Sequence, residues 1–146
     1  MSYSVDVNLL LYASDRSCRQ HEAACTFLDR CAAGPELLVV TWPTLMSYLR
    51  IATHPSIFAS PLNTEDAFAN ILALLSLPHV RPVSELDDFL DACKEVTKGV
   101  SVRGNLVPDA HLATILFQHG VRTLYSSDRD FRRFASLEVR DPLSAK

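Results

Sequence analysis

The apolar residues of this chain fall into two kinds of pattern, short continuous runs and stripes at helical spacing. Residues 37–40 form a continuous run, Leu-Leu-Val-Val, which is typical of a parallel strand covered on both faces. Ala24, Phe27 and Cys31 instead repeat at helical spacing, which predicts the buried stripe of a helix. That helix should end at the Gly34-Pro35 pair.

The same two patterns recur and predict strands that alternate with helices. Strands are expected over residues 3–5, 37–40, 80–83, 121–125 and 137–140. Helices are expected from Asn8 onward, around 24–33, over 42–52, 63–75, 84–98 and 109–119, with a short helical turn over 128–134. This alternation predicts a single α/β domain over residues 1–146, with a central, mostly parallel sheet and helices on both faces.

The composition agrees with one globular domain, and the apolar segments bear on where in the cell the protein acts. The 146 residues are 48% hydrophobic and 21% charged, which suits a chain with a packed core. The apolar run at residues 9–13 follows no basic residue and has Asp6 and Asn8 beside it, so it does not resemble a secretory signal. No apolar stretch is long enough to span a membrane. We therefore expect a cytoplasmic protein without a membrane partner.

Charge and cysteine spacing exclude some further classes. The formal net charge of -3 argues against a protein that binds polyphosphates through overall charge, although local basic clusters can still contact them. The four cysteines have no Cys-Xaa-Xaa-Cys spacing and are expected to be reduced thiols.

Three acids are expected to meet at the edge of the sheet where the strands end. Asp6 follows the first strand, Asp128 follows the strand over 121–125, and Asp109 opens a helix from which its side chain can reach the same edge. Neighbouring carboxylates repel one another and raise each other's pKa, a cost that a divalent cation removes. Oxygen ligands favour Mg²⁺ or Mn²⁺, whereas zinc would favour His or Cys.

Each of these acids also has a structural interpretation. Asp6 and Asp109 could each cap a helix, because Asp is a common N-cap residue. Asp128 could serve the short helical turn that follows it, and Asp130 could cap the turn before Phe131. The convergence of several acids at one edge favours the metal site over these separate explanations.

Several blocks of sequence, in the same order, resemble the PIN domain and more narrowly the VapC-type toxins of bacterial toxin–antitoxin pairs. The blocks are Val5-Asp6-Val7-Asn8, residues 48–55, residues 105–113, Ser126-Ser127-Asp128-Arg129-Asp130-Phe131 and Asp141-Pro142-Leu143. The resemblance implies that Asp6, Asp109 and Asp128 are catalytic metal ligands. It also implies supporting roles for Asn8 and Ser127, a fourth acid near the edge at Asp130, a homodimer and a cognate antitoxin.

The favoured function is an endoribonuclease, dependent on Mg²⁺ or Mn²⁺, that cleaves structured RNA such as tRNA or rRNA with a metal-activated water. Four arginines in or beside the site-bearing segments are candidates for phosphate contacts: Arg50, Arg129, Arg132 and Arg133. One difference from the family stands out: many members carry Glu where this chain has Tyr48.

Two other functions stay open at this point. The exchange at Tyr48 leaves open a catalytically weak relative that binds RNA or an antitoxin without efficient cleavage, although Tyr48 could also be a core residue. A phosphotransfer or phosphatase domain with Asp6 as nucleophile is disfavoured, because the second acid and the lysine that this chemistry uses are not found near Asp6.

Overall fold

The computed structural model describes residues 1–144, which contain a five-stranded sheet. The strands are β1 (Ser2–Val5), β2 (Leu37–Thr41), β3 (Val80–Val83), β4 (Thr123–Tyr125) and β5 (Glu138–Arg140). Their spatial order is β3-β2-β1-β4-β5, and every pairing described is parallel. The expected α/β fold is confirmed, with a sheet that is wholly rather than mostly parallel in these residues.

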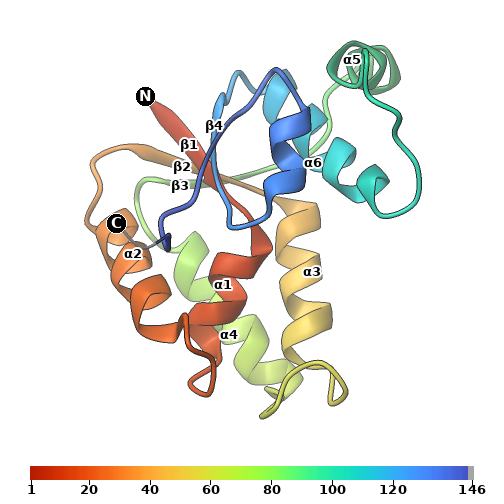
Figure 1. Cartoon of the computed structure of the whole chain (residues 1–146). Helices are drawn as coiled ribbons and strands as arrows, with labels where there is room; N and C mark the ends of the chain where they lie inside the picture. Colours follow the sequence, from red (N-terminus) through yellow and green to blue (C-terminus); the bar gives the residue numbers. More distant parts are fainter. Residues whose placement is uncertain (145–146) are drawn as a thin grey trace.

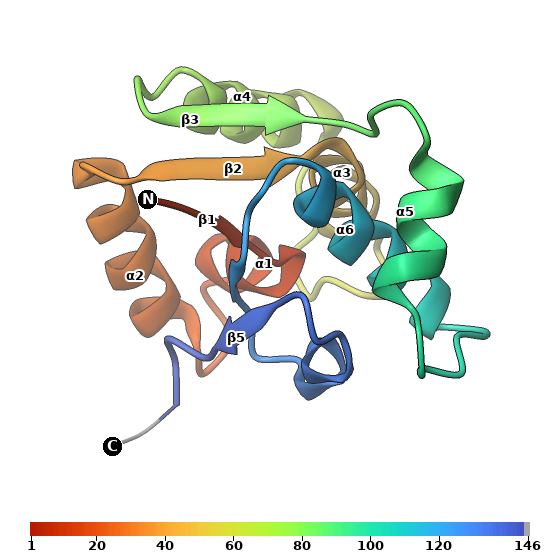
Figure 2. The ribbon, with the colours of Figure 1, turned by 90° about the horizontal axis from the view of Figure 1, so that it is seen from above.

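Helices cover both faces of this sheet, as Figures 1 and 2 show. They are α1 (Val7–Ser14), α2 (His21–Ala33), α3 (Trp42–Ala52), α4 (Thr64–Leu75), α5 (Phe89–Val96) and α6 (Leu106–Gln118), with a 3₁₀ turn η1 over Arg129–Arg133. Helices α1 to α4 lie on one face, and α5, α6 and η1 lie on the other.

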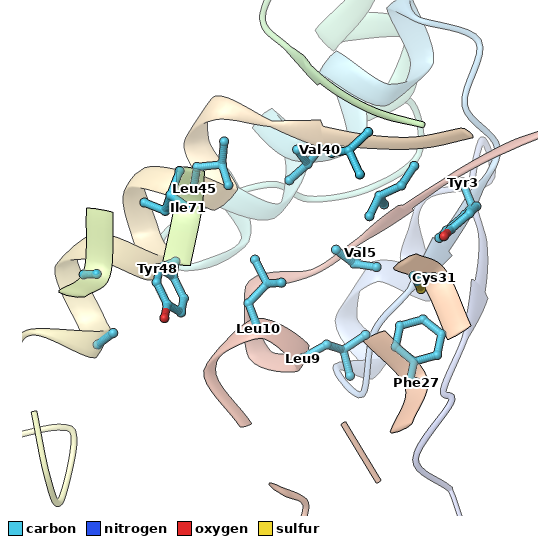
Figure 3. Packing of buried hydrophobic residues seen from close by; sticks show 14 of the residues in the cluster. Tyr3, Val5, Leu9, Leu10, Phe27, Cys31, Val40, Leu45, Tyr48 and Ile71 are labelled. Carbon is cyan, nitrogen blue, oxygen red and sulfur yellow. The ribbon is translucent and has the colours of Figure 1, made fainter. Parts of the chain in front are cut away.

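Strand β2 shows why its sequence is apolar at every position. Successive side chains of a strand point to opposite faces of the sheet. Leu38 and Val40 accordingly pack into the core beneath α1 to α4, while Val39 between them packs into the core beneath α6. Figure 3 shows the first of these cores, in which Val5 and Leu9 meet Phe27.

Some predicted helix boundaries and faces are wrong. Helix α6 begins at Leu106, so Asp109 lies in its first turn rather than opening it. Asp6, not Asn8, is the N-cap of α1. In α4 the helical spacing of Ala67, Phe68, Ile71 and Leu72 predicts that all four are buried. Only Ala67 and Ile71 are buried, whereas Phe68 and Leu72 are 52% and 66% exposed, because the helix packs through its other side.

The start of α5 is also later than predicted. The capping-box-like Ser84-Glu85-Leu86-Asp87 lies in a linker, and α5 starts at Phe89 after Asp88 in a left-handed conformation with φ of 62°. The backbone of this linker is bound by side chains of α6 instead of capping a helix of its own. No helix in the described part of the chain is both long and apolar enough to cross a membrane.

Candidate active site

The chain reverses its direction across the sheet between β1 and β4. From β1 it moves through β2 to β3 at one edge, then returns to the other side of β1 to add β4 and β5. In parallel sheets such a reversal leaves a crevice beyond the carboxyl ends of the two central strands, where ligands bind. The residues that follow β1 and β4 therefore occupy the expected position of a site.

The structure brings three carboxylates together at this position. One carboxylate oxygen each from Asp109, Asp128 and Asp130 lies within 4.8 Å of the others. We call these three residues the acidic cluster. Two of the three expected ligands, Asp109 and Asp128, thus converge, and Asp130, expected as a fourth acid near the edge, belongs to the same cluster.

Asp6 stands beside the acidic cluster without belonging to that group. Its backbone N–H donates to the carbonyl of Tyr125, the last residue of β4, which places it at the same edge. The side chain is only 8% exposed. Burial raises the pKa of Asp6, and the negative charge of Asp128 raises it further.

Ser126 connects Asp6 to the acidic cluster, a role that we did not infer from the sequence. Its buried hydroxyl donates to Asp6 Oδ2 at 2.8 Å and accepts from the backbone N–H of Asp128 at 2.9 Å. The other oxygen of Asp6, Oδ1, accepts from Val7 N–H at 2.7 Å and caps α1. Both oxygens of Asp6 are therefore held in fixed positions.

Asn8 and Ser127, the two expected supporting residues, contact each other. Asn8 Nδ2 donates to Ser127 Oγ at 2.9 Å. Asn8 Oδ1 is buried, and no residue in the described chain donates a hydrogen bond to it. A buried amide oxygen without a donor is costly unless water or a cation binds it.

The structural interpretations of the acids are partly confirmed, since capping and clustering occur together. Asp128 Oδ1 accepts from the backbone N–H of Asp130 at 2.9 Å and caps the 3₁₀ turn η1. Asp130 is not the cap of that turn; its Oδ1 lies 3.8 Å from Arg133 Nε in an exposed pair. For Asp109 the capping interpretation is wrong, because Asn105 is the N-cap residue of α6.

The pKa of Asp109 is raised strongly. Burial raises its pKa to about 6, and the charges of Asp128, Asp6 and Asp130 contribute in that order. A carboxyl group that resists ionisation beside other carboxylates is the electrostatic mark of a cation site or of a proton-transfer site.

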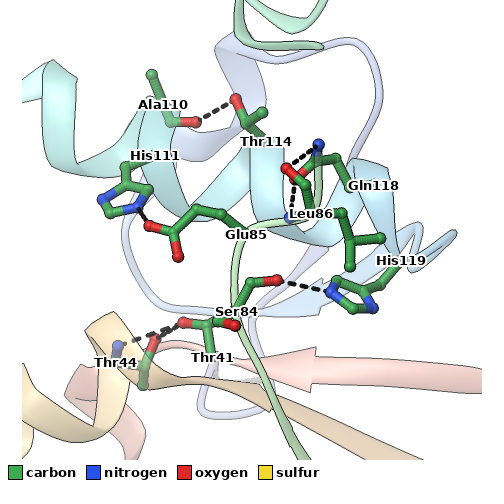
Figure 4. A network of polar contacts seen from close by, with 10 residues as sticks. All are labelled: Thr41, Thr44, Ser84, Glu85, Leu86, Ala110, His111, Thr114, Gln118 and His119. Carbon is green, nitrogen blue, oxygen red and sulfur yellow. Dashed lines mark hydrogen bonds and ion pairs between the residues drawn. The ribbon is translucent and has the colours of Figure 1, made fainter. Parts of the chain in front are cut away.

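Helix α6, which carries Asp109, is fixed to the linker before α5 (Figure 4). His111 Nε2 lies 2.7 Å from Glu85 Oε2, and His119 Nε2 lies 2.8 Å from the carbonyl oxygen of Ser84. Gln118 accepts from Leu86 N–H and donates to its carbonyl oxygen. These bonds give His111 a structural role, and they hold in place the helix that carries Asp109.

The four arginines proposed as RNA contacts lie in different surroundings. Arg129 and Arg132 line a cavity of about 210 Å³ together with Asp128. Arg133 pairs with a carboxylate of the acidic cluster. Arg50 lies in the last turn of α3 and is not among the described residues that line this cavity.

Comparison with known proteins identifies the family. No model of a protein family matches the chain. Ribonuclease VapC48 of Mycobacterium tuberculosis is 44% identical over 144 residues, which is 99% of each chain, and Ribonuclease VapC33 of the same species is 35% identical over 94% of this chain and 96% of its own.

The chain belongs to the VapC ribonuclease family.

Solved structures agree with this VapC assignment at the level of the fold. The VapC20 toxin of M. tuberculosis, described as cleaving the sarcin-ricin loop, superposes with a TM-score of 0.66 at 17% identity and covers 92% of this chain and 98% of its own. VapBC2 from Rickettsia felis, bound to a promoter DNA fragment, gives a TM-score of 0.67 at 16% identity and covers 97% and 98%. The α/β fold of this VapC chain is therefore the PIN-domain fold.

Tyr48 does not belong to the acidic site of this VapC chain. It is 3% exposed, packs in the core beneath α1 to α4 (Figure 3), and bonds through its hydroxyl to Ser14 Oγ at 2.7 Å and Asn70 Nδ2 at 2.9 Å. The core interpretation of Tyr48 is confirmed.

Tyr48→Phe is therefore expected to affect stability and not catalysis. Loss of the two hydroxyl hydrogen bonds should lower the free energy of unfolding by about 1 kcal/mol and the Tm by about 2–4 °C. Thermal unfolding followed by circular dichroism measures the loss. A change in metal affinity with unaltered stability would instead place Tyr48 in the site.

Proposed function

We propose that this VapC family member is a Mg²⁺- or Mn²⁺-dependent endoribonuclease, the toxin of a type II toxin–antitoxin pair, acting in the cytoplasm through one PIN-like nuclease domain over residues 1–146. Membership of the VapC ribonuclease family supports the RNA-hydrolysing activity. The observation that carries the metal-dependent mechanism is the approach of Asp109, Asp128 and Asp130 to within 4.8 Å at the reversal point of the sheet.

The residues present suit a small, hard divalent cation. Every side chain at the cluster offers oxygen, and Mg²⁺ and Mn²⁺ bind such ligands together with several waters. Burial raises the pKa values of Asp109 and Asp6 and the neighbouring carboxylates raise them further, so a bound cation would favour the ionised form of both acids. The buried oxygen of Asn8, which accepts no hydrogen bond in the described residues, would offer a neutral oxygen ligand to such an ion.

Each residue then has a defined task in hydrolysis. Asp109 and Asp128 would hold the ion, with Asp130 of the same cluster and the neighbouring Asp6 as further carboxylates. Ser126 fixes Asp6 relative to the backbone of Asp128. A bound ion of this kind supplies an activated water and neutralises charge on the phosphate.

The finer substrate and the partners also belong to this proposal. The VapC20 toxin with this fold is described as cleaving the sarcin-ricin loop, which supports structured RNA, tRNA or rRNA, as the substrate class here. Toxin–antitoxin complexes with this fold, from R. felis and from Salmonella typhimurium, support a cognate antitoxin. A homodimer is retained as the proposed assembly.

The proposed function is tested by incubating purified, antitoxin-free protein with total RNA. Cleavage should occur with Mg²⁺ or Mn²⁺, stop with EDTA and resume when excess Mn²⁺ is added. Absence of EDTA-sensitive cleavage would instead support the weak relative that binds without cutting. Because Tyr48 lies in the core, that alternative no longer has a residue at the site to support it.

Ser126→Ala tests the positioning of Asp6. It removes the hydrogen bond that lowers the pKa of Asp6 and the acceptor for the backbone N–H of Asp128. We expect kcat to fall by about 10–100-fold, as for other groups that orient metal ligands. The acid limb of the pH–rate profile should move to higher pH, because Asp6 would then ionise less readily. Ser56→Ala, at an exposed serine, is the control.

A further inference from the structure

Two cysteines and a histidine that the proposed mechanism does not use lie together around the loop that joins α1 to α2 (Figure 1). Cys18 belongs to this loop, His21 is the first residue of α2, and Cys25 follows one helical turn later. The backbone N–H of His21 donates to the carbonyl oxygen of Cys18 at 3.3 Å, so the chain is already tightly wound there. Positions i, i+3 and i+7 share one face of such a winding, and the three side chains therefore meet the same neighbour.

That neighbour is the last turn of α1. Cys18 Sγ and His21 Nδ1 both bond the carbonyl oxygen of Tyr12, at 3.7 Å and 2.9 Å. The same oxygen also accepts from the backbone N–H of Asp15 at 3.3 Å. Because this carbonyl has two nitrogen donors, it does not depend on the weaker thiol donor. The Cys18 side chain is therefore free to bind another group.

The bond from His21 to Tyr12 determines which ring nitrogen can bind a metal ion. A carbonyl oxygen only accepts, so Nδ1 carries the proton and donates to it. In the neutral ring Nε2 then has a free lone pair, and this nitrogen lies 3.7 Å from Cys25 Sγ. A backbone carbonyl that accepts from the other ring nitrogen is a usual partner of a metal-binding histidine, because it orients the ring. His21 is therefore already oriented as a ligand.

The separation of His21 and Cys25 suits Zn²⁺. Zinc binds thiolate sulfur at about 2.3 Å and imidazole nitrogen at about 2.0 Å in a tetrahedral arrangement, which places the two ligand atoms roughly 3.5 Å apart. The observed separation of Cys25 Sγ and His21 Nε2 is 3.7 Å. Two ligands at positions i and i+4 of a helix are a recurring zinc arrangement. Sulfur and imidazole nitrogen favour zinc over Mg²⁺ and Mn²⁺.

Cys18 can supply the third ligand through a change of its side-chain rotamer. Within residues 1–144 only the acidic cluster has three such ligand atoms within 4.8 Å of one another, so Cys18 Sγ must turn toward the other two ligands. Cys18 lies in a loop and is partly exposed, as are His21 and Cys25, so an ion can reach all three. Three protein ligands leave the fourth position of a tetrahedral zinc ion to water.

We propose that Cys18, His21 and Cys25 form a Zn²⁺ site that is separate from the acidic cluster. Asp6 caps the opposite end of α1, so zinc bound here fixes the far end of the helix that follows this acid. The inference does not rest on the proposed nuclease function, because its ligands are sulfur and nitrogen, whereas the acidic cluster offers carboxylate oxygen.

Cobalt absorption tests this site independently of the acidic cluster. Co²⁺ can replace zinc, and it gives a charge-transfer band in the near ultraviolet when thiolates bind it, whereas Co²⁺ held by carboxylates gives none. Titration of the reduced, full-length wild type with Co²⁺ should produce this band. Zn²⁺ should abolish the band, because it competes for the same sulfur and nitrogen ligands, and excess Mg²⁺ should leave it unchanged.

Cys18→Ser and Cys25→Ser should each weaken the Co²⁺ binding seen in this band by more than a hundredfold, beyond the roughly 10–100-fold cost of losing a group that only orients a ligand. Cys93→Ser is the matched control, because Cys93 is a partly exposed thiol on α5. Asp109→Asn should also keep the wild-type band, because it alters only the acidic cluster.

Alkylation of the wild type gives a measurement that does not depend on how the variants fold. Zn²⁺ should slow the reaction of Cys18 and Cys25 with iodoacetamide by roughly tenfold or more and leave that of Cys93 unchanged, as followed by mass spectrometry of peptides. The inference would be overturned by absence of the charge-transfer band at saturating Co²⁺, by its persistence in both cysteine variants, by its loss in Asp109→Asn, or by equal protection of Cys93.

Discussion

Asp109→Asn is expected to reduce metal-dependent RNA cleavage by more than a hundredfold, beyond the roughly 10–100-fold typical of groups that only orient a ligand. The substitution keeps the size of the side chain and removes its charge. Asp109 lies within 4.8 Å of the other members of the acidic cluster, and burial, together with the charges of the neighbouring acids, raises its pKa to about 6. A bound cation is therefore expected to stabilise the ionised form of this carboxylate.

The loss should arise in catalysis and not in folding. Circular dichroism of Asp109→Asn should match that of the wild type, and Asp128→Asn should behave in the same way. Asp29→Asn, at an exposed position of α2, is the matched control and should cleave normally. Wild-type kcat in both cluster variants would remove the acids from the mechanism.

Mn²⁺ is expected to raise the thermal stability of the wild type strongly at neutral pH. Free ion at about one hundred times its Kd adds about 2.7 kcal/mol to the free energy of unfolding, which corresponds to a Tm increase of roughly 5–10 °C. Asp109→Asn should lose most of this increase, because one carboxylate of the site is gone. Differential scanning calorimetry with and without Mn²⁺ measures the Tm of both proteins.

In the metal-free protein, the raised pKa of Asp109 should lower the free energy of unfolding at neutral pH. The pKa of Asp109 is about 6 in the folded chain against 3.8 ordinarily, so the folded state binds its proton more tightly. The resulting stabilisation is fully present below about pH 3.8 and is lost as pH rises through about 6. At neutral pH, Asp109→Asn in EDTA should gain about 1 kcal/mol after allowance for partial exposure, and roughly 2–4 °C in Tm. A lower Tm for this variant than for the wild type in EDTA would contradict the expectation that ionised Asp109 destabilises the metal-free protein.

Much of the fold could be predicted because local signals agreed with the tertiary structure. Helix α3 was predicted with its observed bounds: Thr41 caps it through its hydroxyl, Pro43 sits in its first turn, and the apolar run of β2 precedes it. The acids could be placed because residues that follow parallel strands meet at one edge. Asp109 was placed there because it was expected to open a helix beside that edge, and it joins the cluster although α6 starts earlier than expected, at Leu106.

The remaining features depend on contacts that sequence spacing does not reveal. Ser126 binds Asp6 across 120 positions of the chain. The Ser84-Glu85-Leu86-Asp87 sequence resembles a capping box, but α6 binds its backbone from more than 30 residues away. Tyr48 could be compared with the family's Glu only by alignment, and its place in the core became clear from the helices packed around it.

Capping and metal binding need not compete in this site. Asp6 and Asp128 each use one oxygen to cap the helical turn that follows their strand, as the structural interpretation of each predicted. Asp6 uses its second oxygen for Ser126, whereas Asp128 keeps an oxygen close to Asp109. The caps therefore orient the carboxylates that the proposed mechanism requires.

Anomalous diffraction from a crystal soaked in Mn²⁺ tests the central claim most directly. The account predicts an anomalous peak at the acidic cluster, coordinated by carboxylate oxygens of Asp109 and Asp128, and no peak there in an Asp109→Asn crystal. A wild-type crystal at saturating Mn²⁺ with no peak between these carboxylates would contradict it.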